Sequence, residues 1–231
     1  MRKNSPRPEV SVNGSNMPAR KHVVITGTGR CGTTFLVELL THLGLDTGFN
    51  SENLEARKYQ IARAGLEHDI RVDPCPYIVK KPRFNEYAQE VLARGDIHIE
   101  HIFIPMRDLY SAAESRRFVE KDTLSRLSLL ERMAVAQSGE PLPGGLWRTT
   151  SVEAGEQEHV LLEQVYDLLL TLSNTSIPIT VMRFPRIVKD CRYLFEKLDP
   201  ILPDVSYKSF ETAFAKSSRP ELVHSFHEND R

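Results

Sequence analysis

The amino-acid sequence predicts an α/β fold in which helices flank a mainly parallel central sheet. Short runs of β-branched and apolar residues alternate along the chain with longer stretches of helical periodicity, the pattern of such layered folds. Each predicted strand also ends in charged or glycine-rich sequence, and parallel sheets bind their ligands at the carboxyl ends of the strands. The 231 residues suffice for one sizeable domain with its own core.

Four segments have the composition of strands: residues 22–26, 77–81, 97–105 and 177–183. Pro178 lies near the start of the last one, where a strand tolerates proline. Along the third, we expect two opposite faces, with Ile97, Ile99, His101 and Phe103 on one and His98, Glu100, Ile102 and Ile104 on the other. The two histidines would then point apart, which favours structural roles over a shared metal site.

Four further segments have helical patterns: residues 33–43, 111–121, 156–173 and 188–198. Gly44 is placed to end the first of them, and the leucine stripe of the third predicts packing in the core. Residues 144–155, between the second and the third, have the composition of a loop. Trp147 in this loop is interpreted either as part of a lid over a bound substrate or as an anchor to the core.

Three regions are predicted along the chain. Residues 1–20 are expected to be a disordered N-terminal tail, residues 21–217 a single domain and residues 218–231 a polar C-terminal tail. The last region contains a few apolar residues that could dock a short helix: Leu222, Val223 and Phe226.

The formal net charge of −1 provides no overall basic field, so neither nucleic acid nor an anionic membrane surface is an expected partner. No apolar stretch is long enough to span a membrane, and the N-terminus does not resemble a secretory signal. The cysteines Cys31, Cys75 and Cys191 have no metal-site spacing. We therefore expect free thiols and a cytoplasmic protein.

Residues 27–34, Gly-Thr-Gly-Arg-Cys-Gly-Thr-Thr, lie between the first predicted strand and the first predicted helix. Glycines allow backbone N–H groups to converge on an anion, and the N-terminus of the following helix adds donors and a positive dipole end. The segment therefore predicts a site for the phosphates of a nucleotide.

Three phosphate-binding motifs overlap in this segment. The Walker loop has its two glycines, but Thr33 stands where its lysine should be, so ordinary ATP or GTP hydrolysis loses a central part. The dinucleotide fingerprint matches the glycine spacing, but residues 45–52 make a poor second strand. A phosphatase loop built on Cys31 would need an arginine at the position of Val37.

The stretch Gly29-Arg-Cys-Gly-Thr-Thr-Phe-Leu36 resembles the 5′-phosphosulfate loop of the sulfotransferases that use 3′-phosphoadenosine 5′-phosphosulfate (PAPS), typically Pro-Lys/Arg-Ser-Gly-Thr-Thr-x-Leu. The resemblance implies a P-loop three-layer sandwich that needs no metal. It also implies contacts to the 5′-phosphosulfate from Gly29, Arg30, Cys31, Gly32, Thr33 and Thr34. Glycine in place of the usual proline and cysteine in place of serine remove no donor that the chemistry needs.

Residues 102–115 resemble the 3′-phosphate segment of the same family, in which a strand ends in arginine and a serine follows on the next helix. This implies that Arg107 and Ser115 bind the 3′-phosphate, although Leu109 replaces the usual proline. Arg116 and its neighbour Arg117 are interpreted either as further charge for that phosphate or as an exposed helix face.

Residues 179–198 resemble a late strand–helix segment of the family more loosely, because Pro185-Arg186 replaces its acidic pair. With the two segments above, the resemblance covers residues 22–200. Three motifs in the family's order are more specific than the loop alone.

Residues 78–82, Ile-Val-Lys-Lys-Pro, resemble the family's strand that ends in Lys-x-Pro, whose lysine lies beside the sulfuryl group. The resemblance implies that Lys80 and Arg30 neutralise the departing phosphate. The alternative for Lys80 is a solvated charge at a strand end, and Lys81 is open between the same two roles.

The general base of this family is a His or Glu on the loops after the first helix or near the second strand. Four residues fit this description, although each is also interpretable as a surface residue: Glu52, Glu55, Glu67 and His68. Glu52 is favoured because it follows the glycine-containing turn after the first helix, and Glu67 is second.

Together the motifs predict a PAPS-dependent sulfotransferase that moves a sulfuryl group to a hydroxyl or amine without a metal. The acceptor would be a small molecule, glycan or lipid bound by the loops at residues 48–73 and 140–155. Two alternatives stay open: a divergent P-loop nucleotide kinase, and a catalytically silent nucleotide-binding protein of the same fold.

Overall fold

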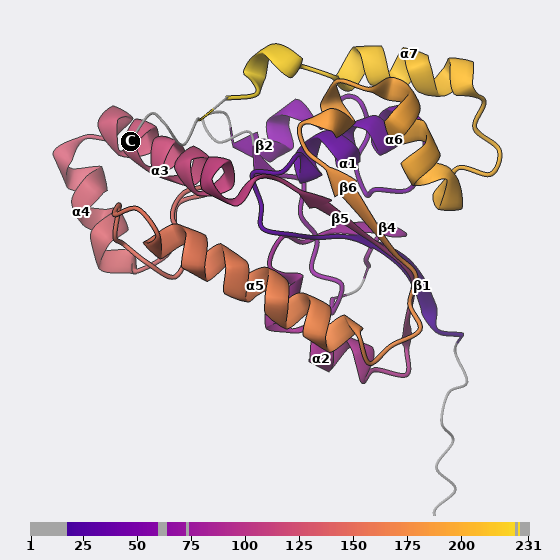
Figure 1. Ribbon diagram of the computed structural model, residues 1–231, viewed down its shortest axis with the longest axis horizontal. Coiled ribbons are helices and arrows are strands. Elements are labelled where there is room, and N and C mark those ends of the chain that lie inside the picture. Colours follow the sequence, from indigo (N-terminus) through magenta and orange to yellow (C-terminus); the bar gives the residue numbers. More distant parts are fainter. Residues whose placement is uncertain (1–17, 60–63, 73, 225, 227–231) are drawn as a thin grey trace, which may run out of the picture.

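The computed structural model describes residues 18–59, 64–72, 74–224 and 226. Its main sheet has four strands, all parallel, in the order β4-β1-β5-β6 (Figure 1). They lie close to the four predicted segments: β1 (Arg20–Ile25), β4 (Ile78–Lys80), β5 (Ile97–Met106) and β6 (Ile179–Arg183). The predicted α/β class with a parallel central sheet is confirmed.

Helices cover both faces of this sheet, so the domain has three layers (Figure 1). One face carries α1 (Thr33–His42), α6 (Cys191–Leu198) and α7 (Tyr207–Ser217), and the other carries α2 (Ala88–Leu92) and α5 (Glu156–Leu172). Val23 and Ile25 of β1 pack in one core cluster with α1, α6 and α7, whereas Val24 packs in the second cluster with α2 and α5. Successive strand residues point to opposite faces, so one strand serves both layers.

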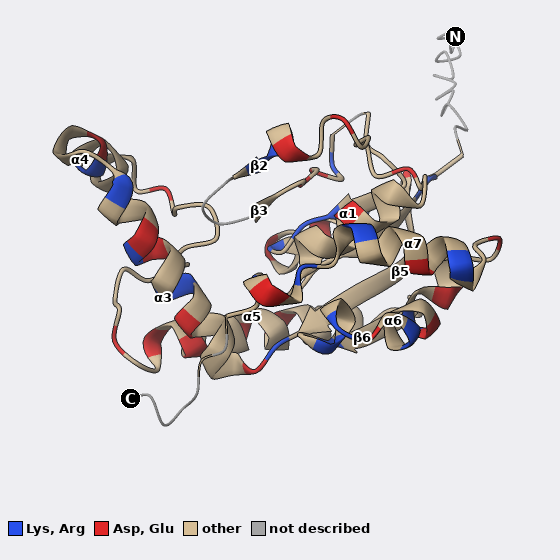
Figure 2. Cartoon of the chain, turned by 90° about the horizontal axis from the view of Figure 1, so that it is seen from above, with Lys and Arg blue, Asp and Glu red and all other residues tan. Residues whose placement is uncertain are grey.

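Two helices form an arm beside the layers: α3 (Leu109–Arg126) and α4 (Leu129–Ser138). Figure 2 shows α4 at the outer end of this arm. Ala112 and Ala113 of α3 pack against Leu161 of α5, which fixes α3 to the body of the domain. Neither α4 nor α7 was predicted, although Ser128 and Glu131 form a capping box at the start of α4.

Strand β5 departs from the predicted alternation because its register with β1 skips Glu100. A β-bulge of this kind adds one residue and reverses which face the following side chains occupy. One core cluster therefore contains all the isoleucines of the strand: Ile97, Ile99, Ile102 and Ile104. Phe103 packs on the opposite face, so the prediction that it shares a face with Ile97 and Ile99 was wrong.

The remaining elements are short. The 3-10 helices are η1 (Glu55–Arg57), η2 (Phe84–Glu86), η3 (Arg186–Val188), η4 (Asp199–Ile201) and η5 (Pro220–Leu222). An antiparallel hairpin joins β2 (Lys58–Tyr59) to β3 (Ala64–Gly65). The helix predicted over residues 188–198 starts only at Cys191, because Val188 ends η3 and Asp190 caps the start of α6.

No helix in the described ranges is both long enough and apolar enough to cross a lipid bilayer. The three cysteines are free thiols, and His101 hydrogen-bonds to the hydroxyl of Thr180 (2.8 Å). Residues 1–17 of the predicted N-terminal tail lie outside the described residues. Val223 of the predicted C-terminal tail packs against the core, and the domain boundaries stay a prediction.

Candidate functional site

The residues between β1 and α1 form the tightly curved loop that the glycine spacing predicts. Positive φ angles occur at Gly27 (136°), Gly29 (68°), Arg30 (56°) and Gly32 (87°). A Cβ at Gly32 would lie 2.9 Å from Phe184 Cδ2, so only glycine fits there without displacing the ring. Helix α1 starts directly after Gly32 and brings the N–H groups of its first turn to the same place.

Hydrogen bonds join the two segments that the sequence predicted for the nucleotide. Arg30 donates from Nε to Ser115 Oγ (3.1 Å), and Arg107 donates from Nη1 to the carbonyl oxygen of Arg30 (3.2 Å). Burial, followed by the nearby charge of Arg107, lowers the pKa of Arg30 to about 10. Arg30 therefore remains charged at neutral pH. Residues predicted from separate motifs meet at one point of the structure.

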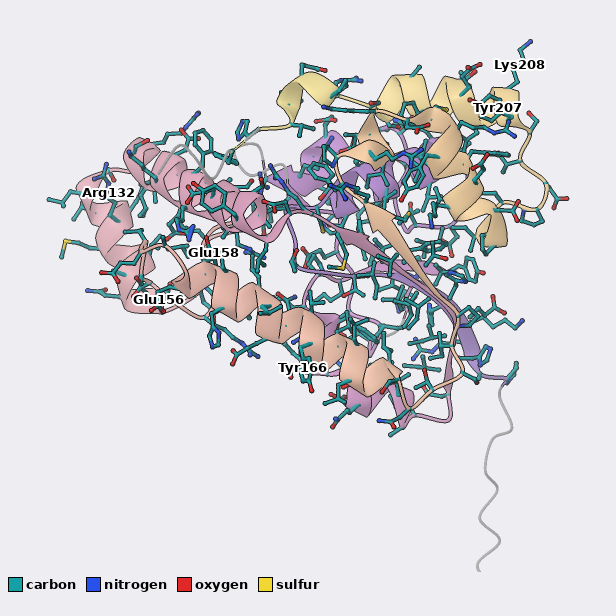
Figure 3. The ribbon with its side chains drawn as sticks, viewed as in Figure 1. Arg132, Glu156, Glu158, Tyr166, Tyr207 and Lys208 are labelled. Carbon is teal, nitrogen blue, oxygen red and sulfur yellow. The ribbon has the colours of Figure 1, made fainter. Side chains whose placement is uncertain are left out.

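Arg116 is a further buried cation beside the loop. Its Nη2 donates to the carbonyl oxygen of Thr28 (2.6 Å) and its Nη1 donates to that of Gly145 (2.6 Å). Burial is the main reason that the pKa of Arg116 falls to about 10. Arg117 instead pairs with Glu158, which Figure 3 shows at the start of α5 beside α3. Neither arginine lies on an exposed helix face, and of the two Arg116 contributes charge at the loop.

Lys80 lies at the end of β4, with its side chain only 2% exposed. Its Nζ donates to Thr34 Oγ1 (3.2 Å) and to the carbonyl oxygen of Gly65, and it lies 3.4 Å from Glu67 Oε1. Burial lowers the pKa of Lys80, and the opposite charge of Glu67 acts in the other direction. Lys80 is therefore a buried, ion-paired cation directed at the start of α1. Lys81, with its Nζ 3.7 Å from Glu67 Oε2, is a more distant partner of the same carboxylate.

The structure brings two of the four candidate bases to Lys80. Glu67 pairs with Lys80 and keeps 33% of its side chain exposed. His68 lies next to it, where its Nε2 hydrogen-bonds a backbone carbonyl (3.1 Å) and burial lowers its pKa. Glu52 and Glu55 are exposed, and neither is among the described residues that line the cavity around Lys80. The base favoured from the sequence, Glu52, is thus not brought to the lysine.

These residues surround one cavity of about 970 Å³. It is lined by most of the predicted site, namely Gly29, Arg30, Gly32, Thr33, Thr34, Glu67, Lys80, Arg107 and Ser115. Cys31 does not line it; the thiol is fully buried, and burial raises its pKa. Among the described residues, no group of three or more His, Cys, Asp or Glu side chains could hold a metal ion.

The cavity is strongly positive although the whole chain has a formal net charge of −1. Among its described lining residues, eight Lys and Arg side chains against two Glu side chains leave a formal charge of +6. The cations are Arg30, Arg57, Lys58, Lys80, Arg83, Arg107, Arg116 and Arg219, and the anions are Glu38 and Glu67. Such a concentration of one charge attracts a polyanionic ligand.

Residues 141–144, 146 and 147 build one wall of the cavity. The Trp147 N–H donates to Oε1 of the fully buried Gln157 (2.7 Å), which anchors this wall to α5. The guanidinium carbon of Arg83 lies 4.0 Å from the centroid of the Trp147 ring. Of the two roles that the sequence left open, these contacts fit the anchor, and the role as a lid stays a prediction. Arg83 was not predicted, although its place directly after Lys-Lys-Pro was an available signal.

The C-terminal segment closes another side of the cavity. Arg107 Nη2 donates to the carbonyl oxygen of His224 (2.5 Å), and Ser111 Oγ donates to that of Phe226 (3.3 Å). The guanidinium carbon of Arg107 lies 5.1 Å from the centroid of the Phe184 ring. No sequence pattern connects His224 or Phe184 to Arg107, so these two lining residues were missed.

No family model and no curated protein matches this chain. Among solved structures, it is similar to the sulfotransferase domain from the curacin biosynthetic pathway, with a TM-score of 0.48 and 16% sequence identity. The similarity covers 90% of this chain and 87% of that chain.

Gly32→Ala should destabilise the domain, because alanine at a positive φ is strained and its methyl group would press on Phe184. We expect urea denaturation to show a free energy of unfolding lower by about 2–4 kcal/mol. Gly95→Ala is the matched control, since a Cβ there meets nothing within 4 Å; its effect should stay within about 0.5 kcal/mol. Equal stability of the two variants would contradict the loop geometry.

Proposed function

We propose that this chain is a PAPS-dependent sulfotransferase that moves a sulfuryl group to a hydroxyl or amine of an acceptor. The observation that carries the proposal is the cluster of Arg30, Ser115 and Arg107 at the glycine loop. It joins two sets of phosphate-binding groups at one end of a cationic cavity. A nucleotide with anionic groups at both its 5′ and 3′ positions matches two such sets.

The charge of the cavity fits this donor. PAPS carries roughly four negative charges at neutral pH, about two of them on its 3′-phosphate. Arg107 and Ser115 would bind that phosphate, while Arg30, Thr34 and the N–H groups of the loop would bind the 5′-phosphosulfate. The formal charge of +6 along the described lining is enough to neutralise the whole donor.

A divergent nucleotide kinase has less support. Thr33 occupies the position at which a Walker loop has the lysine that reaches the β- and γ-phosphates. The carboxylates of the described cavity lining, Glu38 and Glu67, each pair with a lysine, Lys58 and Lys80 respectively. The empty site therefore has no carboxylate without a paired lysine among its described lining residues, whereas a magnesium site prefers such carboxylates.

Lys80, Arg30 and Glu67 would carry the chemistry. The acceptor oxygen or nitrogen forms a bond to sulfur in line with the breaking bond between sulfur and the bridging phosphate oxygen, and 3′-phosphoadenosine 5′-phosphate leaves. Lys80 and Arg30 neutralise the charge that develops on the departing phosphate. Glu67 takes the proton of the acceptor. The reaction needs positioning and charge stabilisation, which these side chains supply.

Calorimetric titration tests the proposed function directly. The protein should bind 3′-phosphoadenosine 5′-phosphate in the presence of EDTA, and added magnesium should not create tight ATP binding, because the loop lacks the Walker lysine. Magnesium-dependent ATP binding without affinity for the 3′-phosphorylated nucleotide would contradict the proposal in favour of a kinase. Binding of the bisphosphate without transfer from PAPS to any acceptor in a broad panel would indicate a catalytically silent protein.

Arg107→Ala should lower the affinity for 3′-phosphoadenosine 5′-phosphate about 10- to 100-fold, since hydrogen bonds to charged groups contribute about 1.5–3 kcal/mol. The affinity for adenosine 5′-phosphate, which lacks the 3′-phosphate, should fall less than about threefold. Lys208→Ala, at the exposed outer end of α7 (Figure 3), is the control for loss of one positive charge. Equal losses for both nucleotides would remove Arg107 from the 3′-phosphate site.

Glu67→Gln should lower kcat by about 10²- to 10⁴-fold, the usual contribution of a general base, while the affinity for 3′-phosphoadenosine 5′-phosphate changes little. Glu52→Gln is the matched substitution, and its kcat should stay within about twofold of wild type because Glu52 is exposed and outside the described cavity lining. Steady-state transfer kinetics measure both. The opposite order of effects would make Glu52 the base.

A further inference from the structure

The cavity holds more positive charge than the proposed donor neutralises. The described lining has a formal charge of +6, and PAPS carries roughly four negative charges. Part of the positive charge is therefore left for the second substrate. The surroundings of Arg83 indicate which chemical group of this substrate it binds.

Arg83 lies half-buried in the cavity wall and stacks on the face of Trp147, 4.0 Å from the ring centroid. No carboxylate pairs with it anywhere in the described part of the chain. Arg148 differs from Arg83 in this respect. Its guanidinium carbon lies 5.9 Å from the centroid of the same ring, but its Nη2 is paired with Glu86 Oε1 (3.3 Å). A stacked guanidinium keeps its in-plane N–H groups available for two parallel hydrogen bonds to a planar or tetrahedral anion.

Both partners in this stack are held in place. The backbone N–H of Trp147 donates to Gln157 Oε1 (2.7 Å). On the other side, Gln164 Nε2 donates to the carbonyl oxygen of Pro82 (2.6 Å), directly before Arg83. A cation fixed in this way loses little conformational entropy when an anion binds, which favours recognition. Its position on an aromatic face adds a cation–π contribution that supports the orientation.

The position of Arg83 favours the acceptor over the donor. The donor groups belong to the glycine loop, the start of α1 and the start of α3, where Arg30, Ser115 and Arg107 meet. Arg83 instead follows Lys80 after two intervening residues, and Trp147 belongs to the loop at residues 140–155 that the sequence predicts for the acceptor. An anionic group bound by Arg83 would thus belong to the same substrate whose hydroxyl or amine reaches Lys80 and Glu67.

We infer that the acceptor carries an anionic group, a carboxylate or a phosphate or sulfate ester, which Arg83 binds on the face of Trp147. This inference rests on the proposed function, because it names the class of acceptor for that reaction. It separates acidic sugars and acidic phenols from their neutral counterparts as substrates.

The test measures binding of matched pairs to the complex of the full chain with 3′-phosphoadenosine 5′-phosphate, by titration calorimetry. The pairs are 4-hydroxyphenylacetate and 4-hydroxyphenylacetamide, glucuronate and glucuronamide, and glucose 6-phosphate and glucose. In at least one pair the anionic member should bind about tenfold more tightly or better. The phosphate pair distinguishes an ester from the two carboxylates.

Arg83→Gln should reduce that preference to within about twofold while leaving the affinity for 3′-phosphoadenosine 5′-phosphate unchanged, which also shows that the variant is folded. Lys208→Gln removes the same charge at the outer end of α7 (Figure 3) and should keep the preference.

Three results would overturn the inference while the proposed function stands: no preference in any pair, a preference that survives in Arg83→Gln, or a loss of nucleotide affinity in Arg83→Gln as large as the loss for the acids. Absence of nucleotide binding by the wild-type protein would overturn both.

Discussion

The rest of the candidate site depends on the hydrogen bonds of the buried Arg116 guanidinium. Its two hydrogen bonds reach the glycine loop at Thr28 and, at Gly145, the segment that builds one cavity wall, so α3 holds both in one arrangement. Ser115, one residue earlier on the same helix, is thereby presented to Arg30. Burying a charge whose hydrogen bonds go to carbonyl groups is costly. An anionic ligand at the loop would relieve the repulsion between Arg116 and Arg30, and its binding would stabilise the fold.

Much of the fold could be predicted because local composition and burial agree. The four strands are short apolar runs, and their parallel order needs the intervening helices that the periodicity indicates. The bulge at Glu100 could not be predicted, because both faces of β5 are buried and either register satisfies the pattern. Helix α7 was missed because few of its residues, including Phe210 and Ala213, are buried.

The candidate site was predictable at positions where the backbone geometry or the ligand chemistry requires a particular residue type at a fixed spacing. The positive φ of Gly32 and its close approach to Phe184 require glycine, and Arg30, Arg107 and Ser115 belong to motifs of fixed spacing. The neighbourhood of Lys80 had no such signal, because an irregular connection with a short hairpin follows α1. Whether Glu52 or Glu67 reaches the lysine depends on how that connection folds back. The same applies to the stacking of Arg83 on Trp147, which brings together residues far apart in sequence.

Under the proposed function, Glu67 has two tasks that cannot be performed at once. A lysine as buried as Lys80 needs a counter-charge, and Glu67 supplies it with its Oε1 3.4 Å from the ammonium nitrogen. While Glu67 is held in this ion pair, its carboxylate is not available to take the proton of an acceptor. The phosphosulfate of a bound donor would take over the neutralisation of Lys80, and Glu67 would then be released from the ion pair beside the acceptor. This arrangement couples the presence of the donor to the activation of the acceptor, so one ion pair would serve both the stability of the empty site and the order of the reaction.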